Sequence, residues 1–281
     1  MGWKDLLVML DPAADTPGRL ALAAMLAERF GAHLVGLYPV PPSEPVRPIF
    51  APDLAGLEPL FHEWRARALT EAENTRQSFE HIAGLRGLSC EWRTVGEARE
   101  DAPAVHARYA DLAILGQRDP DDEAMAMYRP SPERVTLATG RPILVVPYAG
   151  EFATVGRSVL VAWDAGREAA RAVADAMPLL TGAEEVNVLI VDPRAGLDGH
   201  GEVPGADIAL HLARHGVEAQ VERTQSAGVP IGELILSRAA DLGSDLLVMG
   251  AYGHSRAREL LLGGATRSIL AGMTIPVLMA H

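Results

Sequence analysis

The sequence predicts an α/β protein made of two tandem, doubly wound domains, each built on a parallel sheet. Two short apolar runs, residues 6–10 and 159–163, each lead into an aspartate, Asp11 and Asp164. Runs of this length between turn residues are typical of strands that are buried on both faces. A stretch with helical periodicity and then another apolar run follow each of them, so strands alternate with helices as they do around a parallel sheet.

The two halves repeat the same pattern, which indicates a duplication. Residues 111–116 align with residues 245–250, and a proline opens the last apolar run twenty-six residues beyond the glycine that ends each segment. A repeat this long with identical spacing is the signature of a tandem array. We therefore predict a linker around residues 148–156 and domains at 1–150 and 151–281. The expected helices are residues 20–30, 59–82, 168–180 and 207–215, and the remaining expected strands are residues 33–40, 143–146, 186–191 and 277–279.

The composition limits which binding partners and which cellular compartment we expect for this protein. With 25 basic and 37 acidic residues, the net charge of −12 repels nucleic acid and anionic membranes. No apolar run approaches the roughly 18 residues of a membrane span, and the N-terminus leads directly into a strand pattern, so we expect a cytoplasmic protein without a secretion signal. Cys90 is the single cysteine, which excludes an internal disulfide, and we expect its thiol to be buried and inert.

A glycine-rich segment after the fourth strand of the second half carries the chemistry. Gly250, Gly253 and Gly263 let the backbone approach a ligand closely. Residues 263–266 then open a helix that runs to about residue 271. The amide groups and the positive dipole end of a helix N-terminus suit a phosphate, and the Thr266 hydroxyl can donate one more hydrogen bond.

This segment resembles the phosphate loop of ATP-binding universal stress proteins, in which glycine, two residues, glycine, nine residues and glycine precede a serine or threonine. Gly250, Gly253 and Gly263 fit that spacing, and Thr266 matches the second hydroxyl of the family's run. Gly264 departs from it, because a hydroxyl residue is usual there. One side-chain ligand to phosphate is therefore lost, and the resemblance implies weaker or altered nucleotide binding.

The resemblance covers nearly the whole chain and implies a stress-response regulator that binds ATP or a related adenine nucleotide, with Mg as an expected companion. Asp164 matches the family's aspartate at the end of strand one, near adenine, ribose or a metal-bridged phosphate, and Ile190 matches the position that contacts adenine. The implied nucleotide site consists of Asp164, Ile190, Met249, Gly250, Gly253, His254, Gly263, Gly264, Ala265 and Thr266.

For several of these residues the sequence leaves a plainer interpretation open. Asp164 could simply cap the helix that follows it, and capping is the favoured interpretation of Asp11. His254 is equally well explained as an exposed loop residue. His211 and His215 have a spacing that suits a metal on a helix, but with no third ligand in evidence a solvated face is favoured.

The same loop in the first half is predicted to have lost its ligand. Gly116 remains, but the gap-free alignment sets side chains where bare glycine is needed and sets prolines where backbone amides are needed. The residues opposite Gly253, Gly263, Gly264, Ala265 and Thr266 are Asp119, Arg129, Pro130, Ser131 and Pro132. We expect a structural or partner-binding role for this degenerate domain.

The sequence leaves two classes of function open. The sequence contains no recognisable nucleophile or oriented general base, and the loop is not a Walker sequence. We therefore expect at most slow ATP hydrolysis, and we expect ATP binding to act as a switch. The alternative is a nucleotide-independent protein-interaction module of the same fold. An adenine-nucleotide α-hydrolase has less support, because residues 164–167 lack its Ser-Gly-Gly-x-Asp loop. Since single-domain relatives dimerise through the last strand, the resemblance implies a pseudo-dimer of the two halves and leaves a further homodimer open.

Overall fold

The structure is a computed structural model, and it describes residues 2–40, 58–96, 102–121, 130–193, 203–253 and 264–281. Contacts among these residues group the chain into two compact units, Trp3–Thr139 and Gly140–His281. Each unit alternates strands with helices around a mainly parallel sheet, which confirms the predicted fold class. The repeat-based domain boundary at residue 150 stays a prediction.

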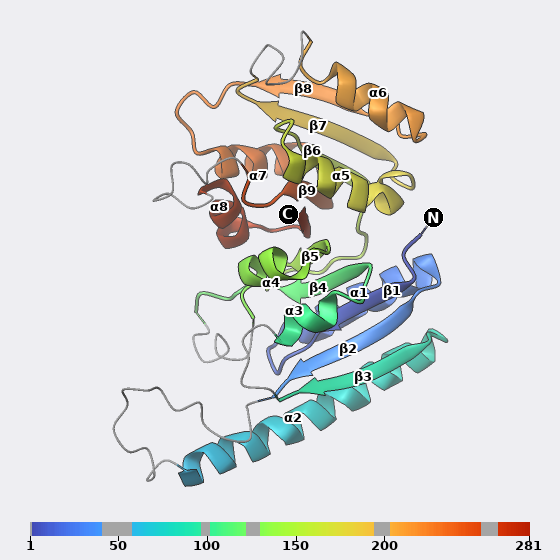
Figure 1. Cartoon of the computed structure of the whole chain (residues 1–281), viewed down its shortest axis with the longest axis vertical. Coiled ribbons are helices and arrows are strands. Elements are labelled where there is room, and N and C mark those ends of the chain that lie inside the picture. The colour runs from blue at the N-terminus through green and yellow to red at the C-terminus, as the bar shows by residue number, and fades with distance from the viewer. Residues whose placement is uncertain (1, 41–57, 97–101, 122–129, 194–202, 254–263) are drawn as a thin grey trace. The chain divides into compact units, whose positions relative to one another are not determined.

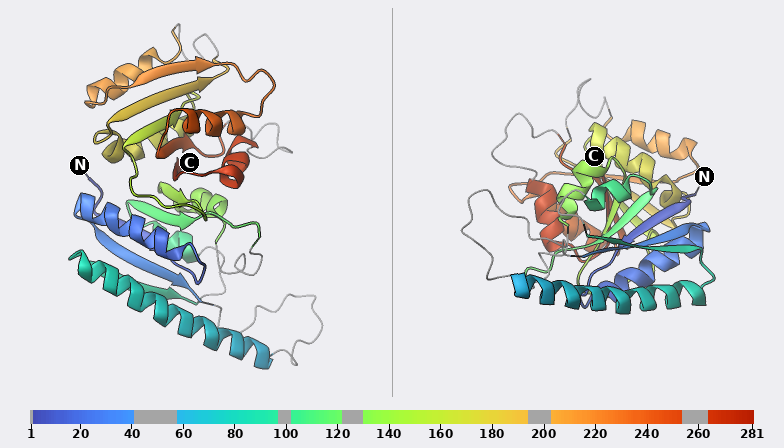
Figure 2. Two further views of the ribbon diagram at one scale, coloured as in Figure 1. Left: turned by 180° about the vertical axis from the view of Figure 1, so that it is seen from behind. Right: turned by 60° about the horizontal axis from the view of Figure 1, so that its bottom comes forward.

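In the first unit, four parallel strands lie in the order β3-β2-β1-β4. Helices α1 and α2 cover one face of the sheet and α3 and α4 the other, as the two opposite views show (Figures 1 and 2). Strand β1 lies between β2 and β4, so the chain changes direction across the sheet at that strand. The elements are β1 (Asp5–Met9), α1 (Thr16–Phe30), β2 (His33–Pro39), α2 (Glu58–Leu85), β3 (Cys90–Val95), α3 (Ala102–Ala107), β4 (Leu112–Gly116) and α4 (Pro132–Thr139).

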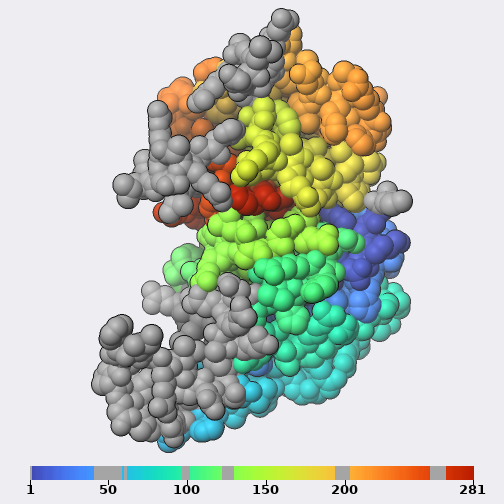
Figure 3. Space-filling model, in the orientation of Figure 1, coloured from blue at the N-terminus to red at the C-terminus, as the bar shows by residue number. Residues whose placement is uncertain are grey.

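The second unit has the strand order β5-β10-β9-β6-β7-β8, in which only β5 runs antiparallel to its neighbour. Helices α5 and α6 lie on one face and are visible at the surface of this unit (Figure 3), and α7 packs against α8 on the other. The elements are β5 (Ile143–Val146), β6 (Ser158–Ala162), α5 (Arg167–Leu180), β7 (Glu185–Val191), α6 (Ala206–Arg214), β8 (Gln220–Thr224), α7 (Ile231–Asp241), β9 (Leu246–Gly250), α8 (Gly264–Gly272) and β10 (Val277–Ala280).

The central strands form because their residues are apolar on both faces of the sheet. In β1, β4 and β5 nearly every side chain is buried, as expected of strands covered by helices on two sides. Helix α1 begins at Thr16 rather than at residue 20, because Pro17 suits the first turn of a helix. An aspartate before the fourth strand anchors the start of the first strand in each unit: Asp111 accepts hydrogen bonds from two backbone amides and Asp245 from three.

The structure corrects the expectation for Cys90. Its side chain is exposed at the start of β3, an edge strand, rather than buried in the core. Partial burial and then the charge of Glu80 raise the pKa of this thiol, so its protonated form is favoured. In the part of the chain that the structure describes, no helix is long and apolar enough to span a bilayer.

Candidate functional site

The ends of β6 and β9 in the second unit bring the predicted nucleotide residues to one edge of the sheet. Ala162 pairs with Met249 in the parallel register, and the chain beyond each strand leads to Asp164 and Gly250. Strand β6 lies between β7 and β9, so this edge is the topological switch point. Ligands of open parallel sheets bind in the crevice at that point, beyond the carboxyl ends of the strands.

Gly250 is a glycine because helix α5 begins directly against it. A Cβ atom added at Gly250 would lie 2.4 Å from the backbone nitrogen of Ala169 and 2.6 Å from the carbonyl carbon of Glu168. No side chain fits in that space, so the glycine lets the first turn of α5 approach the end of β9. The N-terminal end of α5, where the helix dipole is positive, is thereby held at the candidate site.

Glu168 is a buried carboxylate beside this glycine segment, and the sequence analysis did not identify it. Its side chain is 6% exposed, and Arg167 Nε donates a hydrogen bond to its Oε1 at 2.5 Å. A Cβ atom added at Gly253 would lie 3.0 Å from Glu168 Oε2. Burial by itself raises the pKa of this carboxyl, but hydrogen bonds from Arg167 and from its own backbone amide, with the charges of Arg167 and His281, bring its pKa below the usual value. The site therefore contains an ionised carboxylate at neutral pH.

Asp164 closes the turn before α5 with one oxygen and faces the site with the other. The backbone amide of Gly166 donates to Asp164 Oδ1 at 2.8 Å, a short-range bond that is typical of an Asx turn. Because Gly166 is the N-cap of α5 and no side chain caps this helix, the capping interpretation of Asp164 is wrong. Oδ2 lies 3.8 Å from the position of a Cβ at Gly253, and Asp164 is exposed, so this oxygen can meet a ligand.

Helix α8 contributes the other side of the site. Its first residues are Gly264, Ala265 and Thr266, and the backbone amide of Tyr252 lies 3.5 Å from Thr266 Oγ1, in position to donate to it. This contact links the turn after β9 to the first turn of α8 and buries Thr266 to 3% exposure. Gly264 is exposed, and a Cβ atom added there would meet nothing within 4 Å. His254 and Gly263 lie outside the described residues.

Two of the predicted residues are enclosed by the protein. Ile190 is fully buried, and a Cβ atom at Gly205 would lie 2.9 Å from Ile190 Cδ1, so this side chain packs beneath the chain that leads into α6. Met249 is 5% exposed. The last paired residues of β6 and β7 are Ala162 and Leu189, so Val191 lies at the carboxyl end of β7, beyond that pair. It is partly exposed, which makes it better placed than Ile190 to meet a ligand at this edge.

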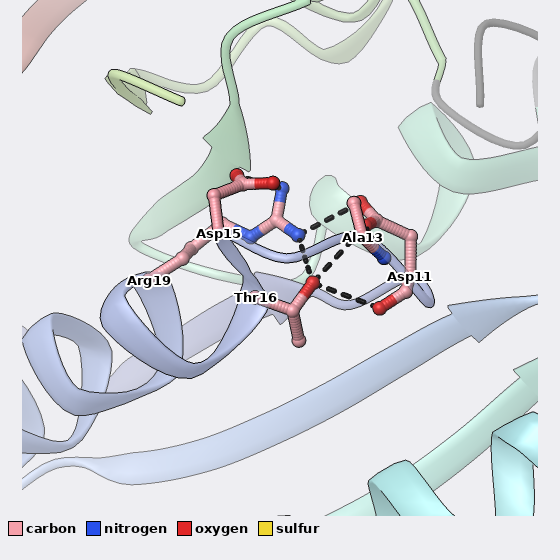
Figure 4. Close-up of polar contacts among 5 residues, drawn as sticks. All are labelled: Asp11, Ala13, Asp15, Thr16 and Arg19. Carbon is pink, nitrogen blue, oxygen red and sulfur yellow. Dashed lines mark hydrogen bonds and ion pairs between the residues drawn. The ribbon is translucent and has the colours of Figure 1, made fainter. Parts of the chain in front are cut away.

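The equivalent edge of the first unit is filled by a buried arginine that the sequence analysis missed (Figure 4). Arg19 is 1% exposed, and its Nη2 donates to Asp11 Oδ2 and to Thr16 Oγ1, both at 2.7 Å. The capping interpretation of Asp11 is wrong, because the N-cap of α1 is Asp15. The amide of Ala13 donates to Asp11 Oδ1 at 3.0 Å in the turn that precedes the helix. The sequence gives one indication of this residue. When residues 6–10 are aligned with residues 159–163, Arg19 stands opposite the apolar Ala172.

The described end of the degenerate loop in the first unit leads into helix α4, and its two prolines, Pro130 and Pro132, donate no backbone amide. Pro132 is the first residue of α4, a position where proline is tolerated because its missing amide would have no partner within the helix. The Ser131 hydroxyl donates its hydrogen to the Glu133 carboxylate, so this hydroxyl is already engaged by a side chain of the protein. Arg129 lies outside the described residues.

The two histidines of α6 are neighbours without a metal-binding partner among the described residues. The rings of His211 and His215 lie 4.8 Å apart, centroid to centroid. No group of three or more histidine, cysteine, aspartate or glutamate side chains in the described part of the chain is arranged to hold a metal ion.

Two sequence comparisons name the same family, and the solved structures share its fold. Residues 156–281 match the model of the universal stress protein family. Universal stress protein Slr1230 of Synechocystis sp. is 24% identical over 98% of this chain and 99% of its own. Among solved structures, a universal stress protein from Archaeoglobus fulgidus has a TM-score of 0.68 at 15% identity, covering 98% of this chain and 95% of that one. A functionally unknown protein from Pseudomonas aeruginosa has a TM-score of 0.57 at 16% identity, over 99% and 92% of the two chains.

Proposed function

We propose that the second half of this chain, which matches the model of the universal stress protein family, binds ATP or a related adenine nucleotide as a regulatory ligand in a stress response. The proposal depends most on the contact between the Tyr252 amide and Thr266 Oγ1. This contact brings the glycine turn after β9 and the N-terminus of α8 to one edge of the sheet. Glycines next to helix amides are what a polyphosphate requires.

Each part of the proposed site has a distinct task. The first turn of α8 supplies amide donors to phosphate. The Thr266 hydroxyl accepts from the Tyr252 amide and can donate its own hydrogen to phosphate at the same time. The exposed Asp164 carboxylate and the partly exposed Val191 lie where β6 and β7 end, and they would meet the nucleoside. Ile190 matches the position that contacts adenine in the family, and from its buried place it would support the base from below.

The charge of the site favours a nucleotide that carries a cation. Asp164 Oδ2 and Glu168 Oε2 both face Gly253, so two carboxylates lie beside the path of the phosphates. Such neighbours repel a bare polyphosphate and favour one whose charge is partly neutralised by Mg²⁺. Asp164 is the exposed ligand that this chain offers to the metal. No described residue of the site forms a nucleophile–base pair, so binding, rather than turnover, is the proposed role.

Titration calorimetry of the full chain with ATP and Mg²⁺ tests the proposal. Thr266→Val should weaken binding about tenfold or more, because a hydrogen bond to a charged group contributes about 1.5–3 kcal/mol. Thr139→Val is the matched control, since Thr139 is a buried threonine of α4 in the first unit. Gly263→Val should abolish binding. Absence of heat at millimolar ATP, with no nucleotide retained by the purified protein, would refute the proposal.

The two carboxylates beside Gly253 also favour the alternative, a nucleotide-independent interaction module. They and the missing hydroxyl at Gly264 both weaken the case for a phosphate at this edge. Thermal unfolding separates the two functions, because a ligand present at 100 times its Kd stabilises the native state by about 2.7 kcal/mol. A melting temperature unchanged by ATP, with or without Mg²⁺, would support the interaction module.

The pairing of β5 with β10 supports the proposed pseudo-dimer. These are the last strands of the two sequence repeats, and they run antiparallel within the unit Gly140–His281, with Val145 opposite Val277. A last strand that is already paired in this way has no open edge left for a second copy of the chain.

A further inference from the structure

Arg19 has an environment that surface arginines do not share. Its guanidinium is buried among Asp11 Oδ2, Thr16 Oγ1 and the carboxylate of Asp15, whose Oδ2 lies 3.8 Å from Nη1 (Figure 4). The side chains of Asp11 and Asp15 are 5% and 9% exposed. One buried cation is therefore held between two buried carboxylates and a hydroxyl, and a buried charge is tolerated only with such partners.

This guanidinium lies at the topological switch point of the first unit. Asp11 follows β1, which lies between β2 and β4, and Gly116 ends β4. A ligand of an open parallel sheet is expected at that place. A Cβ atom added at Gly116 would lie 1.9 Å from Arg19 Nη1, so the guanidinium is packed directly against the end of β4.

Among the described residues of the second unit, no buried arginine takes the place of this side chain. The repeat sets Ala172 opposite Arg19, while Asp164, Glu168 and Gly250 stand opposite Asp11, Asp15 and Gly116. At Gly250 the nearest atoms belong to the backbone at the start of α5, whereas at Gly116 the nearest atom belongs to Arg19. Both halves thus keep an acidic pair and a glycine at this edge. Among the described residues only the first half adds a buried cation, because Arg167, which pairs with Glu168 in the second half, is 76% exposed.

We propose that Arg19 is a built-in ligand of the first half. Its guanidinium occupies the ligand position between β1 and β4, neutralises the carboxylates there and keeps this edge permanently in an occupied form. The first half is therefore stable without an external ligand, and any response to a nucleotide belongs to the second half. Removal of the side chain should leave a buried, negatively charged vacancy with the size and hydrogen-bonding pattern of a free guanidinium ion.

Rescue by guanidinium tests this proposal in the full chain and needs no nucleotide, so its outcome is independent of whether the second half binds ATP. Arg19→Ala should lower the melting temperature by roughly 10 °C, since it leaves buried carboxylates without their cation. Guanidinium chloride at about 20 mM should restore about 2 °C if its Kd is on the order of 10 mM. Sodium chloride at equal ionic strength should restore nothing.

Two comparisons make the rescue specific. The wild type and Arg29→Ala, which removes an exposed arginine of the same helix, should show no rise with guanidinium. Equal rises in Arg29→Ala and Arg19→Ala would overturn the proposal, because they would mean that guanidinium acts elsewhere. No rise in folded Arg19→Ala would also overturn it.

A second experiment holds even where Arg19→Ala does not fold. Gly116→Ala should lower the melting temperature by several degrees in the wild type, because its methyl group meets the guanidinium. The same change should cost clearly less in Arg19→Lys, which keeps the positive charge but lacks Nη1. Gly84→Ala, a glycine of α2 with nothing within 4 Å of the added Cβ, should have the same small effect in both backgrounds. An equal cost of Gly116→Ala in the two backgrounds would overturn the proposal.

Discussion

Restoring the hydroxyl that Gly264 lacks should tighten nucleotide binding. A side chain at this position has room, because an added Cβ meets nothing within 4 Å and the residue is exposed at the first position of α8. Gly264→Ser therefore adds a donor to phosphate without a steric cost. A hydrogen bond to a charged group contributes about 1.5–3 kcal/mol, which corresponds to a Kd lower by a factor of roughly 10 to 100.

Gly264→Ala is the matched control for this gain. It adds the same Cβ, and both serine and alanine favour a helix over glycine, so the steric effect and part of any stabilisation of α8 appear in both variants. Titration calorimetry with ATP and Mg²⁺ should give a lower Kd for the serine variant than for both the alanine variant and the wild type. If serine and alanine give the same Kd, phosphate does not reach the N-terminus of α8 and the proposed binding mode is wrong.

Two further predictions concern the framework around the site. Asp245→Ala should destabilise the protein by about 2 kcal/mol, because it removes the acceptor for the amides of residues 156–158, whereas the exposed Asp241→Ala should stay within about 0.5 kcal/mol; denaturant unfolding measures both. Glu168→Gln should cost stability near neutral pH and lose that effect in acid. Because the folded state lowers the pKa of Glu168, its ionised form stabilises the fold above the usual value of 4.5, and this contribution disappears as the pH falls through the lowered pKa. Melting temperatures of the two proteins should therefore converge with falling pH, and a constant difference would contradict the assignment.

The central strands could be predicted because burial on both faces leaves a clear mark in the sequence. Residues 143–146 were expected and form β5, and the duplicated segment that ends at Gly116 or Gly250 forms β4 and β9. Edge strands β3 and β8 were not expected, because only part of each is buried and their sequences mix charged with apolar residues. Cys90 was misjudged for the same reason, since it lies on the exposed edge strand.

The need for a glycine at position 250 could also be predicted from sequence, whereas the buried charged groups near it could not. A glycine at fixed spacing is visible in the sequence even where the atoms that require it, here those of Glu168 and Ala169, lie far away along the chain. The burial of Arg19 and Glu168 depends on which side chains the fold brings to the same edge, and composition or periodicity does not encode that. The loss of the ligand in the first half is a prediction from Asp119 and from the prolines at 130 and 132, and the structure adds a buried arginine at this edge that the sequence did not reveal.

Gly116 and Gly250 share one alignment column, yet their physical reasons differ, and a pair of double mutants should reveal this. Gly250→Ala sets a methyl group against the backbone of Ala169 and Glu168, which cannot move without displacing α5, so we expect a cost of about 1–3 kcal/mol or more. Glu168→Ala should not relieve it, because the atoms in conflict at Glu168 are its carbonyl carbon and Cβ, which alanine keeps. The two changes should therefore be additive, in contrast to Gly116→Ala with Arg19→Lys. Relief of Gly250→Ala by Glu168→Ala would show that the side chain, rather than the helix backbone, demands the glycine.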